Sequence, residues 1–302
     1  MSKILVTGGA GFIGSHLVDQ LIEKGYQVKV IDNLSTGSKE NLNKEAEFFN
    51  LDIRDFEKIE PVFRDVDYVF HLAAIPRVPI SVEDPINTSH VNILGTVNVF
   101  KAALNCKRVV FASSSSVYGN QKTLPLREEM IPNPLSPYGL QKQVGEQFAS
   151  MFTELYNLPV VCLRFFNVYG PRVDFDSDYS LVLGKFLKQY SQGNSLTVYG
   201  DGEQTRGFCF VIDVVKANIQ AMLSEKIKGG EVINVGSERS ASINRLTELI
   251  GGKVDYLPPR KGDPLHTKAD ITLAKELLDW SPKVDFEEGV EKTKEWFNKN
   301  YE

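Results

Sequence analysis

Short apolar, β-branched runs alternate with longer helical patterns up to about residue 166, and this alternation restricts the fold more than any other feature. Strands buried on both faces read as continuous apolar runs, and strand-then-helix repeats form right-handed βαβ units. The sequence therefore predicts an α/β fold built on a doubly wound parallel sheet. The predicted strands are Lys3–Thr7, Gln27–Asp32, Tyr68–Leu72, Arg108–Ser113 and Pro159–Phe165, and the predicted helices include Ile13–Lys24, Val91–Leu104 and Tyr138–Tyr156.

Four glycines, Gly8, Gly9, Gly11 and Gly14, fill the turn between the first predicted strand and the first predicted helix. A Cβ there would block the tight turn and hold a pyrophosphate away from the backbone. The helix that follows offers free N–H groups and the positive end of its dipole. Because a strand precedes the turn and a helix follows it, we predict a dinucleotide site rather than a plain glycine turn.

Asp32 ends the second predicted strand, where a dinucleotide site places an acid. Its carboxylate is expected to accept hydrogen bonds from the adenosine ribose and to repel a 2′-phosphate, so NAD is favoured over NADP. Asp52 follows the segment Phe48–Leu51 and is predicted to reach the adenine edge, with an acid in a surface turn as the alternative.

Composition excludes several classes of protein. The net charge of −5 does not suggest a surface for nucleic acid or membrane. Cys106, Cys162 and Cys209 are odd in number and far apart, so neither a disulfide framework nor a metal site is expected. The first residues lack the apolar core of a signal peptide, and no apolar run reaches membrane-spanning length. We therefore expect a cytoplasmic protein.

The pattern changes after about Asn167, where glycine, proline and aspartate become frequent. We predict a dinucleotide-binding domain over residues 1–166, to which residues 208–236 return through strands at Phe208–Val214 and Glu231–Val235. A smaller substrate-binding lobe is expected from residues 167–207 and 237–302.

A second group of polar residues points to catalysis. Tyr138 and Lys142 are four residues apart and share one helix face, where the ammonium is expected to lower the pKa of the phenol. The serines of Ser113–Ser116 follow an apolar run at the carboxyl end of a predicted strand, where ligands bind in such folds. A serine hydroxyl there is suited to orient a substrate hydroxyl beside Tyr138. With the glycine turn, these features favour catalysis over an exposed helix face.

The chain resembles the extended short-chain dehydrogenase/reductase superfamily and its NAD-dependent epimerase/dehydratase family, most closely the UDP-glucose 4-epimerases. The resemblance covers nearly the whole chain and implies a Rossmann fold with a smaller C-terminal lobe. The matching segments are Thr7–Gly14, His71–Ala74, Asn92–Thr96, Ser113–Gly119, Tyr138–Lys142, Arg164–Arg172, Arg260–Asp263 and Leu278–Pro282. Gly207, where the family usually has aspartate, is a departure.

The resemblance also implies a role for particular residues. Tyr138 is expected to be the base, Lys142 to hold the base and the nicotinamide ribose, and Ser114 to align the substrate. The residues expected to contact NAD are Gly8, Gly11, Phe12, Ile13, Gly14, Asp32, Asn33, Ser35, Thr36, Gly37, Asp52, Ile53, Leu72, Ala73, Ala74, Asn92, Tyr138, Lys142 and Phe166. Those expected to contact a UDP-sugar are Ser114, Ser116, Asn167, Leu196, Thr197, Tyr199, Arg206, Arg260, Asp263 and Thr267.

The serines favour one chemistry within the family. The dehydratases have an Asp-Glu pair after the catalytic hydroxyl, and the decarboxylases have a Glu just before Val-Tyr-Gly. Here those positions are Ser115 and Ser116, which cannot act as carboxylate bases. We therefore expect C4 epimerisation of a UDP-hexose through a transient 4-keto sugar.

Other functions stay open. A nucleotide-sugar dehydratase and a UDP-glucuronate-acting epimerase or decarboxylase share the first step. A net oxidoreductase would accumulate NADH. A non-catalytic dinucleotide-sensing regulator can share the fold, but such proteins typically lose the Tyr or Lys that this chain has.

Two further expectations concern the substrate and the assembly. Thr267 falls where the epimerases place the side chain that limits room for the C2 substituent of the sugar. Because threonine is small, UDP-N-acetylglucosamine is expected to be accepted along with UDP-glucose. A homodimer is also expected, because the helices around Val91–Leu104 and Tyr138–Tyr156 have apolar residues beyond one core-facing stripe.

Overall fold

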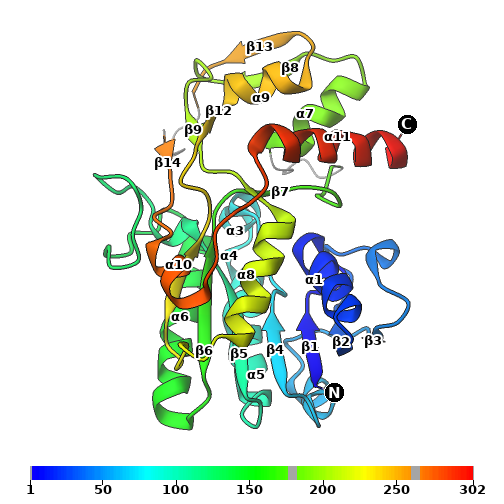
Figure 1. Cartoon of the computed structure of the whole chain (residues 1–302), viewed down its shortest axis with the longest axis vertical. Helices are drawn as coiled ribbons and strands as arrows, with labels where there is room; N and C mark the ends of the chain where they lie inside the picture. Colours follow the sequence, from blue (N-terminus) through cyan, green and yellow to red (C-terminus); the bar gives the residue numbers. More distant parts are fainter. Residues whose placement is uncertain (1, 176–181, 260–265, 302) are drawn as a thin grey trace.

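A parallel sheet forms the centre of the molecule (Figure 1). The computed structural model describes residues 2–175, 182–259 and 266–301. The strands of the central sheet are β1 (Lys3–Thr7), β2 (Gln27–Ile31), β3 (Glu47–Phe49), β4 (Tyr68–His71), β5 (Arg108–Ser114), β6 (Val160–Phe165) and β11 (Val232–Val235). Their order is β11-β6-β5-β4-β1-β2-β3, so the direction of strand addition reverses between β1 and β4, as in doubly wound Rossmann sheets.

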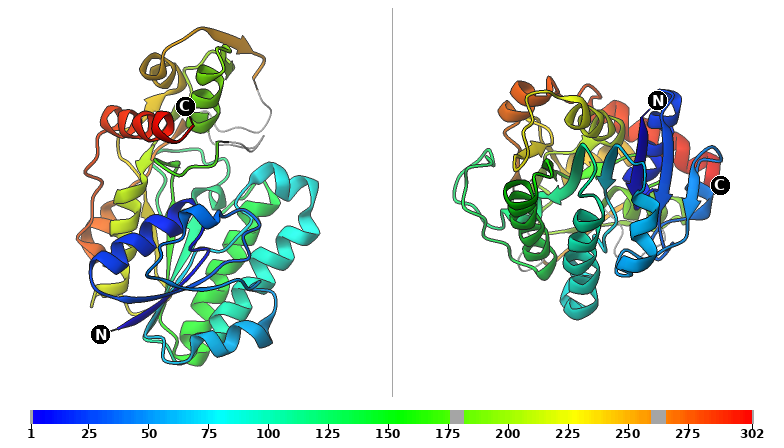
Figure 2. Two further views of the ribbon diagram at one scale, coloured as in Figure 1. Left: turned by 90° about the vertical axis from the view of Figure 1, so that its right-hand side faces the viewer. Right: turned by 90° about the horizontal axis from the view of Figure 1, so that it is seen from below.

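Helices cover both faces of this sheet, as Figure 2 shows. The helices are α1 (Phe12–Glu23), α2 (Phe56–Ile59), α3 (Val78–Glu83), α4 (Pro85–Ser89), α5 (Gly95–Ala102), α6 (Pro137–Tyr156), α7 (Val182–Ser191), α8 (Val211–Leu223), α9 (Ile243–Ile250), α10 (Thr272–Leu278) and α11 (Phe286–Tyr301). The shorter helical turns are η1 (Lys39–Asn41), η2 (Glu60–Phe63), η3 (His90–Leu94) and η4 (Ser115–Val117).

Alternate residues of the strands enter two separate cores. Ile4 and Val6 of β1 belong to the core under α1 and α8, whereas Leu5 belongs to the core under α5 and α6. Side chains on a strand point to opposite faces in turn, so a continuous apolar strand requires helices on both sides. The predicted continuous runs therefore correspond to a sheet that is buried on both faces.

A smaller group of elements lies above the carboxyl ends of the sheet strands (Figure 1). It contains α7, α9 and α11, which enclose a third apolar core with Leu196 and Val198. The remaining strands are β7 (Val168–Tyr169), β8 (Leu196–Tyr199), β9 (Thr205–Arg206), β10 (Cys209–Phe210), β12 (Ala241–Ser242), β13 (Val254–Leu257) and β14 (His266–Thr267). They pair as β13-β8, β12-β9-β14 and β10-β7, so segments distant in sequence meet above the sheet.

The predicted sheet strands are confirmed within one residue or so at each end, and Glu231–Val235 returns to the sheet as β11. The strand predicted at Phe208–Val214 is wrong. Cys209 and Phe210 form a short strand paired with β7, and α8 begins at Val211. The apolar, β-branched run is typical of a strand, but here it forms a helix that packs against α1 and against β5 and β6 of the sheet.

The division of the chain into residues 1–166 with 208–236 and residues 167–207 with 237–302 stays a prediction. Helix α10 does not follow this division, because it belongs to the second set of residues but packs with the first. Ala274 and Leu278 of α10 belong to the same core as the sheet strands, and α10 packs on α8 and β11. Among the described residues, no helix is long and apolar enough to cross a membrane, and no His, Cys, Asp and Glu group is suited to a metal ion.

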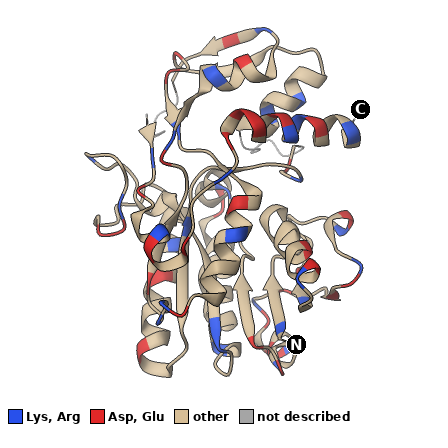
Figure 3. Ribbon diagram, viewed as in Figure 1, with Lys and Arg blue, Asp and Glu red and all other residues tan. Residues whose placement is uncertain are grey.

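Acidic and basic side chains are interspersed over the elements drawn in Figure 3. Two ion pairs between segments that are distant in sequence lie close to the junction of the sheet with the upper elements. Arg172, which follows β7, binds Asp19 of α1 at 2.7 Å. His16 of α1 also hydrogen-bonds the carbonyl of Pro171 at 2.9 Å. The segment after β7 is therefore fixed to the helix that follows the glycine turn. Arg77 and Asp174 form the second pair.

Asp213 of α8 fixes the chain that leads into α11. Its side chain is fully buried, and its Oδ2 accepts hydrogen bonds from the backbone N–H of Lys283 at 2.8 Å and of Val284 at 2.9 Å. The indole of Trp280 also donates to the Asp213 carbonyl at 2.8 Å. One buried carboxylate therefore connects α8 to the last helix of the upper elements.

We predict that Asp213→Ala lowers the free energy of unfolding by about 2–3 kcal/mol, because two backbone N–H groups lose their carboxylate acceptor. Urea unfolding, followed by circular dichroism, measures the change. Asp213→Asn is the matched control, since it retains an acceptor oxygen and should cost clearly less. Equal loss in both variants, or none in either, would contradict this role for Asp213.

Candidate active site

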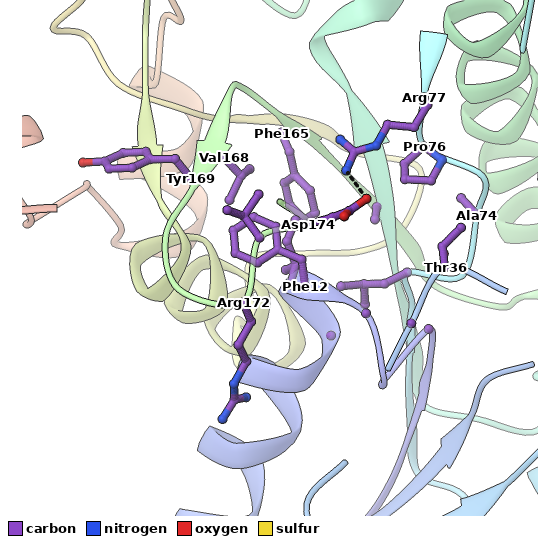
Figure 4. A pocket seen from close by; sticks show the side chains of 18 of the residues that line it. Phe12, Thr36, Ala74, Pro76, Arg77, Phe165, Val168, Tyr169, Arg172 and Asp174 are labelled. Atoms are coloured by element: carbon purple, nitrogen blue, oxygen red, sulfur yellow. Dashed lines mark ion pairs between the residues drawn. The ribbon is translucent and has the colours of Figure 1, made fainter. Parts of the chain in front are cut away.

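A cavity of about 1510 Å³ lies at the carboxyl ends of the central strands, beneath the upper elements. This exceeds the roughly 300–1,000 Å³ of a site for one drug-sized ligand. The cavity therefore has room for two ligands side by side. Figure 4 shows part of its wall, where Phe12 of α1 lies near Phe165, Val168 and Asp174.

The glycine turn is shaped so that backbone reaches the cavity. A Cβ on Gly14 would lie 2.0 Å from the Gly8 carbonyl oxygen. Gly8 has φ +75°, and its Cβ would meet the backbone of Ala73 at 2.7 Å. Gly11 precedes α1 without a side-chain cap, so the first N–H groups of the helix stay open to a ligand. The turn fits the pyrophosphate of a dinucleotide.

Asp32 lies beside this turn and is 8% exposed. Its carboxylate accepts hydrogen bonds from the backbone N–H of Ala10 at 3.0 Å and of Leu34 at 2.8 Å. Burial raises the pKa of Asp32, and these two hydrogen bonds oppose the rise. The carboxylate keeps lone pairs for ribose hydroxyls, whereas a 2′-phosphate would meet a like charge. The residues present thus fit NAD.

Asp52 lies near Asn33 at the same end of the cavity. Asn33 donates to Asp52 at 2.8 Å. Arg54 donates from Nε and Nη2 to the two Asp52 oxygens at 2.9 and 2.8 Å, and this lowers the pKa of Asp52 to about 2. The structure therefore shows a fixed ionised carboxylate. Arg54 was not among the predicted site residues. It is two residues from Asp52, in a loop without a periodic pattern.

Most of the predicted site residues line this cavity. At the dinucleotide end they are Gly8, Gly11, Phe12, Ile13, Gly14, Asp32, Asn33, Ser35, Thr36, Gly37, Asp52, Ile53, Leu72, Ala73 and Ala74. Elsewhere they are Ser114, Ser116, Tyr138, Lys142, Asn167, Thr197, Tyr199 and Arg206. The structure brings these side chains together, while their individual roles stay predictions. Arg260 and Asp263 lie outside the described residues.

Three residues predicted to contact a ligand do not lie on the cavity wall. Phe166 and Leu196 are fully buried in apolar cores, and Phe165 lines the cavity in place of Phe166. Asn92 is 1% exposed and lies behind the wall. It donates to the Ile75 carbonyl at 3.1 Å and accepts from the Ile75 N–H at 2.8 Å, so it holds the loop that follows β4.

Thr267 also lies off the cavity wall. Its hydroxyl accepts a hydrogen bond from Asn167 at 3.1 Å, and Asn167 also donates to the Gly207 carbonyl at 3.3 Å. A Cβ on Gly207 would lie 3.0 Å from the Ser237 carbonyl oxygen, so an aspartate would be crowded here. Arg206 lines the cavity without an acid next to it in sequence.

The reactive end of the cavity is formed by α6 and the carboxyl end of β5. Tyr138 is 9% exposed, and the neighbouring Ser114 side chain acts to lower the pKa of its phenol. The Ser114 hydroxyl itself donates to the Ser116 hydroxyl at 3.2 Å. Lys142, one helical turn later, donates from Nζ to the Ala112 carbonyl at 2.7 Å and lies 5.9 Å from the centre of the Tyr138 ring. The predicted grouping of Tyr138, Lys142 and Ser114 is therefore present.

The pKa values at this end differ from the expectation. The pKa of Tyr138 is raised by burial, which outweighs the opposing effects of the Ser114 hydrogen bond and the Arg77 charge. Burial likewise lowers the pKa of Lys142 to about 8, against the opposing effects of Cys162 and Glu146. Burial therefore dominates at both groups, and the pKa of the phenol is raised where the spacing of Tyr138 and Lys142 predicted that it is lowered.

Several cavity residues were not predicted. They are Pro76, Arg77, Val78, Arg172, Asp174, Lys185, Phe186 and Gln204, with Trp296, Asn300 and Tyr301 from α11. Arg77 follows the carboxyl end of β4, and that position alone is a signal for ligand contact. The residues of α11 give no such signal, because only the tertiary fold brings them to the cavity.

Comparison with known proteins agrees with this geometry. The model of the NAD dependent epimerase/dehydratase family matches residues 4–236. A putative UDP-glucose 4-epimerase of Methanocaldococcus jannaschii is 42% identical over 98% of this chain and 99% of its own length.

Two solved structures have the same fold over almost their whole length. One is a UDP-glucose 4-epimerase of Thermotoga maritima with UDP-glucose, with a TM-score of 0.94 and 42% identity, covering 99% of this chain and 100% of that one. The other is a UDP-N-acetylglucosamine 4-epimerase of Methanobrevibacter ruminantium in complex with UDP-N-acetylmuramic acid, also with a TM-score of 0.94 and 42% identity, covering 99% and 98%. The protein described here therefore belongs to the NAD dependent epimerase/dehydratase family.

Proposed function

We propose that this protein catalyses the NAD-dependent C4 epimerisation of a UDP-hexose. The substrates are UDP-glucose and UDP-galactose, together with UDP-N-acetylglucosamine and UDP-N-acetylgalactosamine. The observation that carries the proposal is the grouping of Tyr138, Ser114 and Lys142 at one end of a cavity large enough for NAD and a nucleotide sugar. The activities of the compared epimerases support it.

Each of these residues then has a task. The Tyr138 phenolate takes the proton from the sugar 4-hydroxyl, while Ser114, beside the phenol, aligns that hydroxyl. Lys142 is held by the Ala112 carbonyl below the base. The glycine turn and Asp32 would hold NAD, which would supply the acceptor for the hydride of C4 and the source of its return. The 4-keto sugar turns its other face before the return, and the protonated Tyr138 gives the proton back.

The carboxylates of the cavity favour epimerisation over water elimination or decarboxylation. Among the described residues that line it, the carboxylates are Asp32, Glu40, Asp52 and Asp174. The first three come from the dinucleotide end, and Asp174 is ion-paired with Arg77. Beside Ser114 the chain has Ser115 and Ser116 instead of acids. A regulator without activity is disfavoured because both Tyr138 and Lys142 are retained at the cavity.

We propose that the substrate range includes N-acetylated sugars, because Thr267 is small and lies behind Asn167 rather than in the cavity. Incubation with UDP-glucose, and separately with UDP-N-acetylglucosamine, should give the C4 epimer of each, identified by NMR of the product. A 4-keto-6-deoxy sugar or a pentose would contradict epimerisation. Conversion of UDP-glucose alone would contradict the broad range.

Tyr138→Phe is predicted to lower turnover by about 10²–10⁴-fold, because the proton acceptor is lost. Binding of NAD, measured from the cofactor content of the purified protein, should stay unchanged. Tyr156→Phe is the matched control, since Tyr156 lies on the same helix, is 48% exposed and is far from the cavity end of α6. A Tyr138→Phe enzyme within a few-fold of the wild type would exclude Tyr138 as the base.

We also propose a homodimer. Val82 of α3, Ile86 of α4 and Leu155 of α6 are 61%, 70% and 65% exposed, and these helices pack side by side. Exposed apolar side chains spread over neighbouring helices are what an interface would cover. Light scattering at micromolar concentration should give the mass of a dimer, and Ile86→Glu should shift it toward that of one chain. A wild-type monomer would contradict the proposal.

A further inference from the structure

Arg77 is a cation in the reactive end of the cavity to which the family resemblance assigned no role. It precedes α3, and its side chain lines the cavity together with Ser114 and Tyr138. The side chain is 17% exposed, so its guanidinium is largely withdrawn from water. In Figure 4 it points across the cavity toward Asp174. A cation held in such a place acts strongly on ionisable neighbours.

The backbone of Arg77 is fixed relative to the base. Ser81 donates from its N–H to the Arg77 carbonyl at 3.1 Å. The Ser81 hydroxyl donates to Val78 at 2.7 Å and accepts from the N–H of Tyr138 at 3.1 Å. Asn92 holds the start of the same loop through Ile75. The loop is therefore tied to the first turn of α6, which places the backbone of Arg77 close to that of Tyr138.

The partner of Arg77 compensates its charge only in part. The shortest distance between the guanidinium and the Asp174 carboxylate is 3.6 Å, which is longer than a hydrogen bond. The Asp174 side chain is 42% exposed, so water screens its charge. A guanidinium whose charge is only partly compensated keeps a positive electrostatic potential toward groups that face away from Asp174. Asp174 weakens that effect without removing it.

Arg77 differs from Lys142 in one respect that matters for the base. Burial lowers the pKa of Lys142 to about 8, so the charge of this lysine depends on pH. A guanidinium stays charged at every accessible pH. Glu146 of α6 and Arg164 of β6 form a buried ion pair and largely offset each other. Arg77 is thus a permanent positive charge near Tyr138.

We propose that Arg77 is a positioning residue for the reaction that acts through Tyr138, and that Asp174 sets the strength of this action. The guanidinium favours the phenolate form of Tyr138, so that more of the enzyme has its base ready at a given pH. The inference rests on the proposed role of Tyr138 as the base. Arg77 is then a second cation that acts on the base, in addition to Lys142 of the Tyr-x-x-x-Lys motif.

The test is the pH dependence of kcat/KM in the NAD-loaded enzyme. Arg77→Gln should move the rise in activity to higher pH by about one unit, since a nearby opposite charge typically shifts a pKa by that amount or more. The loss should therefore be about ten-fold on the acidic side and small at high pH. Arg77→Lys should restore part of the shift. Asp174→Asn should move the rise to lower pH, because the competing carboxylate is gone.

A second readout does not depend on turnover. The tyrosinate absorbance of each variant, minus that of the same variant with Tyr138→Phe, gives the titration of Tyr138 alone. This titration should move with the pH profile of activity. If Arg77→Gln lowers activity equally at every pH, or raises KM while the titration stays in place, the guanidinium contacts substrate and the proposal is overturned. Full activity in Tyr138→Phe would instead overturn the proposed function.

Discussion

The contact between α6 and the ends of β5 and β6 is the constraint on which the site depends. A Cβ on Gly145 would lie 2.6 Å from the ring of Phe111, so helix and strand approach as closely as a glycine allows. One turn from Lys142, Glu146 accepts from Arg164 of β6 at 2.8 and 2.7 Å and from Ser113 of β5 at 2.5 Å. The pair is almost wholly buried, so removal of either partner would leave an uncompensated charge. This arrangement fixes Tyr138 above the strand end where Ser114 lies.

A second constraint brings the upper elements over the sheet. Asp213 connects α8 to the chain before α11, and Arg172 connects the segment after β7 to α1. Both links join parts of the chain that are distant in sequence. Their effect is a cavity with a dinucleotide end, defined by Asp32 and the glycine turn, and a reactive end, defined by Tyr138. The cofactor and the sugar of the proposed reaction would therefore meet near the point where the strand order reverses.

Local patterns predicted much of this arrangement. The glycine turn and Asp32 follow from the needs of a backbone that contacts a pyrophosphate, and Tyr138 with Lys142 follows from helical spacing. Prediction failed where tertiary packing decides. Neighbouring strand residues face opposite ways, and the motif around Phe165 and Phe166 does not say which one faces the cavity.

Other features had no periodic signal in the sequence. The β-branched run that begins α8 is typical of a strand, and only its packing against α1 makes it helical. Arg77 lies in a proline-containing loop without a periodic pattern, and the pKa of Tyr138 depends on burial, which no spacing of residues reveals. Sequence thus predicted which chemical groups meet, and the structure added how their environment alters them.

The proposed epimerisation requires that C4 of the sugar loses a hydride and recovers the same hydride on the opposite face of the sugar. Conversion of UDP-glucose that carries deuterium at C4, in ordinary water, tests this most directly. We expect NMR of the UDP-galactose formed to show the deuterium still at C4, with no accumulation of NADH. Replacement of the label by hydrogen from the solvent would contradict it, because C4 would then have exchanged a proton instead of a hydride.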